Sequence, residues 1–254
     1  MGTRFIEFLD WFSRGFSRAF LEGDRWKLYL KGMGITLELT ITALVIGVIL
    51  GVLVAVIRTA HDQQRVGSKN LALGILNALC KVYTTVIRGT PMMVQLLIWG
   101  FVIFKTSRNH TMVGILGLGI NSGAYVAEIV RGGLMSVDVG QSEASRSLGL
   151  GYVDTMRFIV IPQAFKNILP SLGNEFIMML KETSLASTFF LGDIMTSYLI
   201  VKGATFLTLE PLTIVAAIYL CVTYPLSKLV DKFGKKMSNP NSYRNRKVKA
   251  GGKV

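Results

Sequence analysis

The stretch MGITLELTITALVIGVILGVLVAVI, residues 33–57, decides the class of fold. Glu38 is its single charge, and the run is longer than the about 20 apolar residues that a helix needs to cross a bilayer. Gly47 and Gly51 are separated by three residues, a spacing of small residues that lets two helix backbones approach closely. The stretch therefore predicts a membrane-spanning helix that packs tightly against another helix.

The composition agrees with a membrane protein. Hydrophobic residues make up 51% of the chain and charged residues 17%, and the mean hydropathy is +0.48. A soluble domain has about a quarter of its residues charged. The net charge of +13 comes from basic residues between and beyond the apolar runs. This distribution favours topology signals and lipid contacts over nucleic acid.

Neither a metal site nor a cofactor is expected. Cys80 and Cys221 lie in apolar segments without a CxxC spacing, and His61 and His110 are far apart. The chain has no GxxxxGK[ST], HExxH or GxSxG pattern, so nothing argues for an enzyme. Transport, signalling and scaffolding remain.

We expect an all-α integral membrane protein with about five spans. Segment 71–87 contains Lys81, so it is expected to be an interfacial helix, and the RGTP stretch that ends at Pro91 is expected to start a new helix. The second span is therefore placed at 88–105, with one long bent helix as the alternative. The remaining spans are expected at 111–133, 166–192 and 211–230.

The transmembrane domain is expected at residues 31–232, between an N-terminal segment, 1–30, and a basic tail, 233–254. From Lys228 onward the chain has nine basic residues and one acid, so the C-terminus is predicted to be cytoplasmic and, with five spans, the N-terminus outside. Phenylalanines at three- and four-residue spacing predict an amphipathic helix in the N-terminal segment. Either the membrane interface or the protein's own spans could cover its apolar face.

A polar, glycine-punctuated stretch, SEASRSLGLGYVDTMRFIVIP, follows the third span at residues 142–162. A helix is predicted over 139–148 and a tight turn at Gly149 and Gly151. A second short helix is predicted from Val153 to Pro162, which kinks or stops it. An ordered polar loop of this length (about 138–162) is typical of a functional element, although an ordinary amphipathic loop is the alternative.

The chain resembles the membrane-spanning permease subunits of ATP-binding cassette importers, in their polar amino acid (histidine/glutamine-type) branch. The loop matches their EAA pattern, E-A-A-x3-G-x9-I-x-L-P, with serine at the third position and isoleucine in place of leucine. The resemblance covers roughly residues 30–230. It is carried by IRGTPMMVQLLIWGFV (87–102), AYVAEIVRGGLMSV (124–137), GQSEASRSLGLGY (140–152) and IPQAFKNILPSLGNEFIMMLKETSLAS (161–187).

The resemblance implies a type I importer permease in the bacterial cytoplasmic membrane, whose loop is a coupling helix docked on a separate ATPase. The implied partners are an ATPase dimer, a second permease subunit (identical or homologous), a substrate-binding protein outside the cell and an amino acid. The implied coupling residues are Glu143, Ala144, Ser145, Gly149, Ile159 and Pro162.

Polar residues inside spans are costly and usually face a pathway or a partner. For Glu128, an ion pair with Arg131 three residues later is favoured over a substrate contact. A stand-alone carrier or channel has no need of the 142–162 loop. A membrane scaffold or sensor, whose loop would dock a partner other than an ATPase, has no special need of acids and amides buried in the spans. The candidate pathway residues are Glu38, Gln95, Asn174, Glu175, Lys181 and Glu182.

Overall fold

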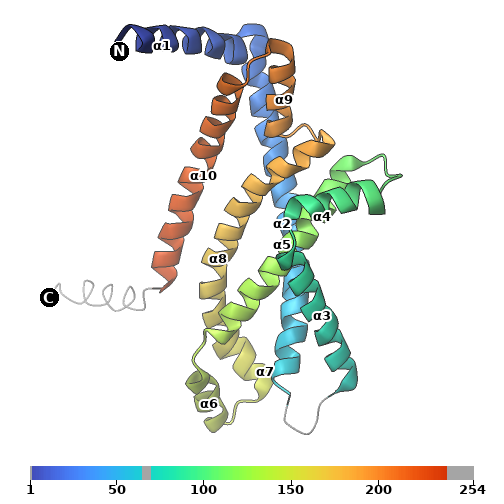
Figure 1. Cartoon of the computed structure of the whole chain (residues 1–254). Coiled ribbons are helices and arrows are strands. Elements are labelled where there is room, and N and C mark those ends of the chain that lie inside the picture. Colours follow the sequence, from blue (N-terminus) through green and yellow to red (C-terminus); the bar gives the residue numbers. More distant parts are fainter. Residues whose placement is uncertain (1, 65–69, 239–254) are drawn as a thin grey trace, which may run out of the picture. The chain divides into compact units, whose positions relative to one another are not determined.

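The computed structural model describes residues 2–64 and 70–238, and most of the predicted basic tail lies outside them. All the regular secondary structure in this part is helical (Figure 1). The α-helices are α1 (Gly2–Phe16), α2 (Arg25–Asp62), α3 (Leu71–Gly89), α4 (Met92–Ile98), α5 (His110–Met135), α6 (Val139–Ser147), α7 (Tyr152–Asp154), α8 (Ile161–Glu182), α9 (Ile194–Thr205) and α10 (Leu209–Ser238). Shorter π and 3-10 segments are η1 (Ser17–Leu21), η2 (Glu22–Asp24), η3 (Trp99–Ile103), η4 (Thr155–Val160) and η5 (Thr183–Phe189).

Among the described residues, 4 helical segments are long and apolar enough to cross a membrane, and up to 5 if a bent pair counts as one span. The four are Leu9–Asp62, Leu71–Gly89, His110–Met135 and Leu209–Met237. The bent pair joins Tyr152–Phe189 to Ile194–Thr205 at 48°. This agrees with the expected number of about five.

The assignment of the second span was wrong. Helix α3 has 19 residues and qualifies as a span, whereas Met92–Ile103 is a shorter apolar helix. Nineteen residues of helix extend about 28 Å, close to the thickness of the hydrocarbon core. Lys81 is exposed on α3, where its long side chain can reach toward the interface, so one lysine does not exclude a span.

The fold divides into two compact units. The first contains residues 1–46, 90–121 and 178–224. Its core combines buried residues of η1, α2, α9 and α10, among them Tyr29, Ile194 and Ile214. Two hydrogen bonds join α2 to α9: the Ile194 amide donates to the Thr36 hydroxyl at 3.1 Å, and the Ser197 hydroxyl donates to the Leu28 carbonyl at 3.0 Å.

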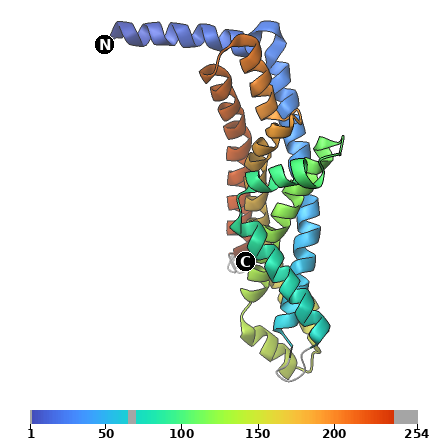
Figure 2. The same ribbon diagram turned by 45° about the vertical axis from the view of Figure 1, so that its right-hand side comes forward.

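The second unit contains residues 47–64, 70–89, 122–177 and 225–238 of the part that the structure describes. Here α2 packs closely on α5, because a Cβ at Gly47 or Gly51 would come within 2.9 or 2.6 Å of Ser122 or Val126. The expected close approach of two helix backbones is confirmed. Figure 2 shows α6 and α7 at the same end of this unit as the C-terminus of α2.

Candidate functional site

The predicted helix–turn–helix is confirmed. Asp138 caps α6 by accepting a hydrogen bond from the Gly140 amide at 2.7 Å. The turn after α6 contains Gly149 at φ +84, a backbone conformation that favours glycine. The amide of Leu150 closes the turn by donating to the Ser145 carbonyl at 3.1 Å, and α7 follows.

The predicted coupling residues take different places in this loop. Glu143, Ala144 and Gly149 are exposed, whereas Ser145 is buried and its hydroxyl lies 2.9 Å from that of Thr155. Ser145 therefore joins α6 to η4 from the inside. Ile159 is half-buried in η4, and Pro162 is exposed.

Pro162 was expected to kink or stop the second helix, and it does not stop it. Helix α8 begins at Ile161, so Pro162 lies in its first turn. The residue before it, Ile161, has helical backbone angles and donates its amide to the Met156 carbonyl of the π-helical segment η4, so the helix does not end at the proline. Helical structure continues from α7 through η4 into α8.

The loop presents an apolar surface. Val139, Leu148 and Val153 are 72%, 83% and 71% exposed. Large apolar side chains that share a polar segment with charged neighbours are typical of a protein contact surface. The loop is therefore suited to bind a partner protein.

A cavity of about 460 Å³ separates α6 from the end of α2. Glu143, Arg146 and Thr59 line it, and the Tyr152 hydroxyl donates a hydrogen bond to Gln63 across it. Sequence reasoning missed this connection, since Gln63 and Tyr152 are 89 positions apart. The bond ties the loop to the end of a spanning helix.

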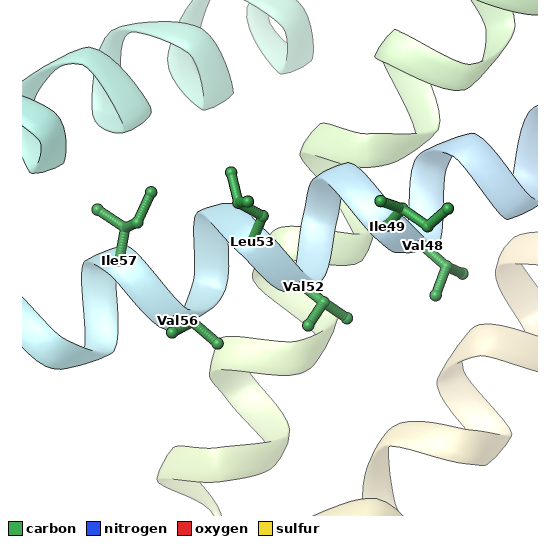
Figure 3. Close-up of a pocket in the computed structure, with 6 residues that line it drawn as sticks. All are labelled: Val48, Ile49, Val52, Leu53, Val56 and Ile57. Atoms are coloured by element: carbon green, nitrogen blue, oxygen red, sulfur yellow. The ribbon is translucent and has the colours of Figure 1, made fainter.

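The membrane-spanning part of α2 in this unit carries apolar side chains over its surface. Figure 3 shows them in two rows, Val48, Val52 and Val56 in one and Ile49, Leu53 and Ile57 in the other. Ile49 is 67% exposed. Side chains of this kind suit a lipid environment or an apolar partner surface.

The pathway candidate Gln95 is held by neighbours in the first unit. Its Oε1 accepts a hydrogen bond from the Asn121 amide at 2.9 Å, and its Nε2 donates to the hydroxyl and carbonyl of Thr90 at 2.7 and 3.0 Å. These bonds secure the turn before α4. Glu38 and Lys181 of the same unit are exposed, and Glu182 is half-buried.

The other two pathway candidates belong to the second unit. Glu175 is buried and accepts a hydrogen bond from the Ser122 hydroxyl at 2.8 Å, while its neighbour Asn174 is exposed. The six candidates are therefore divided between the two units. Neither Gln95 nor Glu175 is an unsatisfied polar group.

Glu128 lies among three arginines. The expected pair with Arg131 is confirmed at 3.3 Å, but Arg58 also binds the carboxylate, and Arg88 lies 3.9 Å from it. Sequence reasoning missed the last two, which come from α2 and α3. The available signal was a single arginine near the end of each apolar run, and spacing along the chain does not show that two such residues meet.

Comparison with known proteins defines the family. Residues 67–239 match the family described as "Binding-protein-dependent transport system inner membrane component". The chain belongs to this family. It is therefore a multi-pass inner-membrane component of a bacterial transport system, as the resemblance predicted.

Named relatives are amino acid permeases. The chain is 34% identical to the arginine transport system permease protein ArtQ of Bacillus subtilis, over 75% of this chain and 83% of that protein. It is 33% identical to the putative glutamine transport system permease protein GlnP of Rickettsia typhi, over 82% of this chain and 92% of that protein.

Solved structures share the fold. An amino acid ABC transporter crystallised with histidines is 40% identical, with a TM-score of 0.74 over 83% of this chain and 94% of that chain. The inward-facing MetNI methionine ABC transporter is 17% identical, with a TM-score of 0.70 over 86% of this chain and 100% of that chain, and it supports the fold alone.

Proposed function

We propose that this chain is the permease subunit of an ATP-driven importer and forms the translocation path for an amino acid. In this proposal a substrate-binding protein delivers the amino acid, and a separate ATPase dimer supplies the energy. A second permease subunit, identical or homologous, completes the path. The permease itself carries out no hydrolysis.

The helical loop from α6 to α7 is the observation that carries this proposal. It is capped by Asp138, closed by Gly149 and braced internally by Ser145, so it is ordered without a partner. It also exposes Leu148 and Val153 beside the acidic Glu143. An ordered polar loop that is tied to spanning helices can transmit a partner's movement to a bundle with two states.

The relatives support an amino acid as the substrate. Their names include arginine, glutamine and nopaline transport systems. Acidic groups within the spans favour a cationic or zwitterionic substrate, because opposite charges offset part of the cost of leaving water. We propose that the pathway includes Glu38, Gln95, Asn174, Glu175, Lys181 and Glu182.

We propose that the C-terminus is cytoplasmic and the N-terminus outside. Five spans and the basic tail support this orientation. We propose that helix α1 lies in the lipid–water interface on the outer side of the inner membrane. Its apolar side chains Ile6, Leu9 and Trp11 are 59%, 47% and 49% exposed. Figure 1 shows α1 extending away from the α2 and α9 helices of its unit, which favours lipid over packing on the spans.

Charge reversal in the loop tests the proposal. The chain is co-expressed with the ATPase and partner permease subunits of its transport system and purified in detergent. The wild type is expected to retain the ATPase and, in proteoliposomes with the binding protein, to couple ATP hydrolysis to amino acid uptake. Glu143→Lys is expected to lose ATPase binding or coupled hydrolysis, because the exposed acid faces the partner.

The matched control is Asp231→Lys, which makes the same charge change at an exposed residue of α10, outside the loop. This variant is expected to bind the ATPase and to couple hydrolysis to uptake as the wild type does. If no ATPase co-purifies with the wild type and Glu143→Lys is silent, a stand-alone carrier or a scaffold becomes the better explanation. Uptake by the chain alone, driven by an ion gradient, would select the carrier.

A further inference from the structure

An apolar groove in the second unit has no part in the proposed transport function. Its volume is about 520 Å³, and side chains of α2, α5, α7, η4 and α8 line it. The α2 wall is the row of Val48, Val52 and Val56 in Figure 3. The opposite row in that figure, which contains Leu53, does not line the groove. Val56 and Phe165 are 56% and 55% exposed, so the groove opens on the protein surface.

The groove is continuous with the cavity between α6 and the end of α2, which we call its mouth. Four residues line both spaces: Thr59, Leu134, Tyr152 and Met156. The groove is apolar in all its lining except Thr59 and Tyr152. The mouth adds further polar side chains, namely Gln63, Ser142, Glu143, Arg146 and Thr155. Groove and mouth together therefore have one apolar and one polar end, as a lipid molecule does.

The length of the groove matches one leaflet of a bilayer. Its α2 wall extends from Val48 to Ala60, which is about 18 Å of helix. Half of the hydrocarbon core of a bilayer is about 15 Å thick. Val48 and Val56 belong to the apolar run at 33–57, whereas Gln63 of the mouth belongs to the polar stretch that follows it. The groove therefore extends from the membrane surface toward the middle of the bilayer.

One hydroxyl lies where the groove meets the mouth. Thr59 lines both spaces, and its buried Oγ1 has no hydrogen-bond partner in the part of the chain that the structure describes. A buried hydroxyl without a partner is costly, so a ligand that supplies one is favoured. The ester groups of a phospholipid lie at this level, between the acyl chains and the headgroup. Their carbonyl oxygens accept hydrogen bonds, which suits the Thr59 hydroxyl.

Two opposite charges line the mouth. Glu143 and Arg146 are exposed and lie three residues apart on α6, yet no ion pair joins them. A free guanidinium group binds phosphate well, because its N–H groups match the phosphate oxygens. A free carboxylate binds an ammonium group. The mouth is therefore complementary to a headgroup that carries both a phosphate and an amine.

We propose that the groove and its mouth bind one phospholipid with a zwitterionic headgroup, such as phosphatidylethanolamine. One acyl chain fills the groove, an ester carbonyl accepts from Thr59, and the phosphate and ammonium groups bind Arg146 and Glu143. The lipid then contacts α2, α8 and Tyr152 together, which strengthens the connection between the polar loop and the spans. This inference goes beyond the proposed function and does not depend on the substrate carried.

The first test fills the groove. The full chain is purified in mild detergent with the other subunits of its transport system and titrated with phosphatidylethanolamine, and the retained lipid is measured by native mass spectrometry. Val56→Trp is expected to lower the affinity at least about tenfold, because excluding about two methylene groups suffices for this factor. The matched control is Leu53→Trp, in the opposite row and also 56% exposed, which is expected to retain lipid as the wild type does.

The second test concerns the headgroup. Arg146→Gln is expected to weaken retention of phosphatidylethanolamine at least about fivefold, because a hydrogen bond to the phosphate is lost. Arg157→Gln is the control, since Arg157 is an exposed arginine of η4 that lines neither space. Phosphatidylglycerol, whose headgroup has no ammonium group, is expected to bind more weakly to the wild type. Glu143 is left unchanged, because it is already a proposed coupling residue.

A photoactivatable benzoylphenylalanine at position 165 identifies what fills the groove in a native membrane, and the expected product is a crosslink to phospholipid. A crosslink to a second permease subunit would instead assign the groove to the contact between subunits and overturn the proposal. Equal retention by Val56→Trp and Leu53→Trp would show that only unspecific surrounding lipid binds. Equal binding of phosphatidylglycerol and phosphatidylethanolamine would refute the zwitterionic headgroup.

Discussion

The turn at Gly149 allows the proposed coupling role of the loop at residues 138–162 to be tested by a graded series of substitutions. Its φ of +84 favours glycine, and a Cβ at this position would meet nothing within 4 Å. A substitution therefore leaves the packing within this chain unchanged and strains its backbone. Asparagine tolerates positive φ, alanine does so less well, and the β-branched valine is the least compatible residue.

The conformational cost sets the size of the effect. A non-glycine residue held in such a conformation costs about 1–3 kcal/mol. At about 1.4 kcal/mol for each factor of ten, the loop's docking-competent conformer loses about five- to 150-fold in population. The apparent affinity for the ATPase is expected to fall in the order Gly149, Gly149→Asn, Gly149→Ala, Gly149→Val.

The assay is titration of the detergent-purified permease with the ATPase, followed by coupled hydrolysis in proteoliposomes. Gly132→Val is the control, because Gly132 is exposed in α5 and a Cβ there meets nothing within 4 Å. All variants are checked for a single peak in size-exclusion chromatography. A Gly149→Val variant that binds the ATPase as tightly as Gly149→Asn would refute the reasoning.

Three further predictions concern the folded bundle. Ser145→Ala removes the hydrogen bond to Thr155 and is expected to cost about 1–3 kcal/mol of local stability, measured as faster hydrogen exchange in α6. Adding Thr155→Val is expected to restore part of this stability, because the second polar group is then removed as well. No recovery in the double variant would contradict the pairing. Gly51→Leu is expected to lower the unfolding temperature by overpacking the α2–α5 contact at a cost of about 1–3 kcal/mol, whereas Gly74→Leu, with open space around it, is expected to be tolerated. Glu128→Gln is expected to lower the free energy of unfolding by about 3–5 kcal/mol, because the largely buried Arg58 loses its counter-charge. Thermal unfolding measures this, and an unchanged stability would show that solvent already screens the cluster.

Local features were predictable because they depend on few consecutive residues. The helix at 139–148 and the turn at Gly149 follow from helix formers ended by a glycine, and the structure places both as expected. The pair Gly47 and Gly51 predicted a close helix contact, which α5 supplies. The pair of Glu128 and Arg131 was predictable because three-residue spacing places both on one helix face.

Span boundaries were less predictable because length and charge gave opposing signals. Lys81 argued against a span at 71–87, yet α3 is long enough and the segment after Pro91 is not. The bend between η5 and α9 was not foreseen. Pro162 was expected to kink or stop a helix, but helical structure continues across it from η4 into α8.

The sequence by itself determined that this chain is a helical membrane protein with an ordered polar loop, because apolar run length and glycine positions act locally. Only the tertiary structure decided that Arg58 and Arg88 lie around Glu128 and that Tyr152 reaches Gln63. These contacts join positions that are far apart in the chain. Their geometry depends on how the helices pack, which no local pattern encodes.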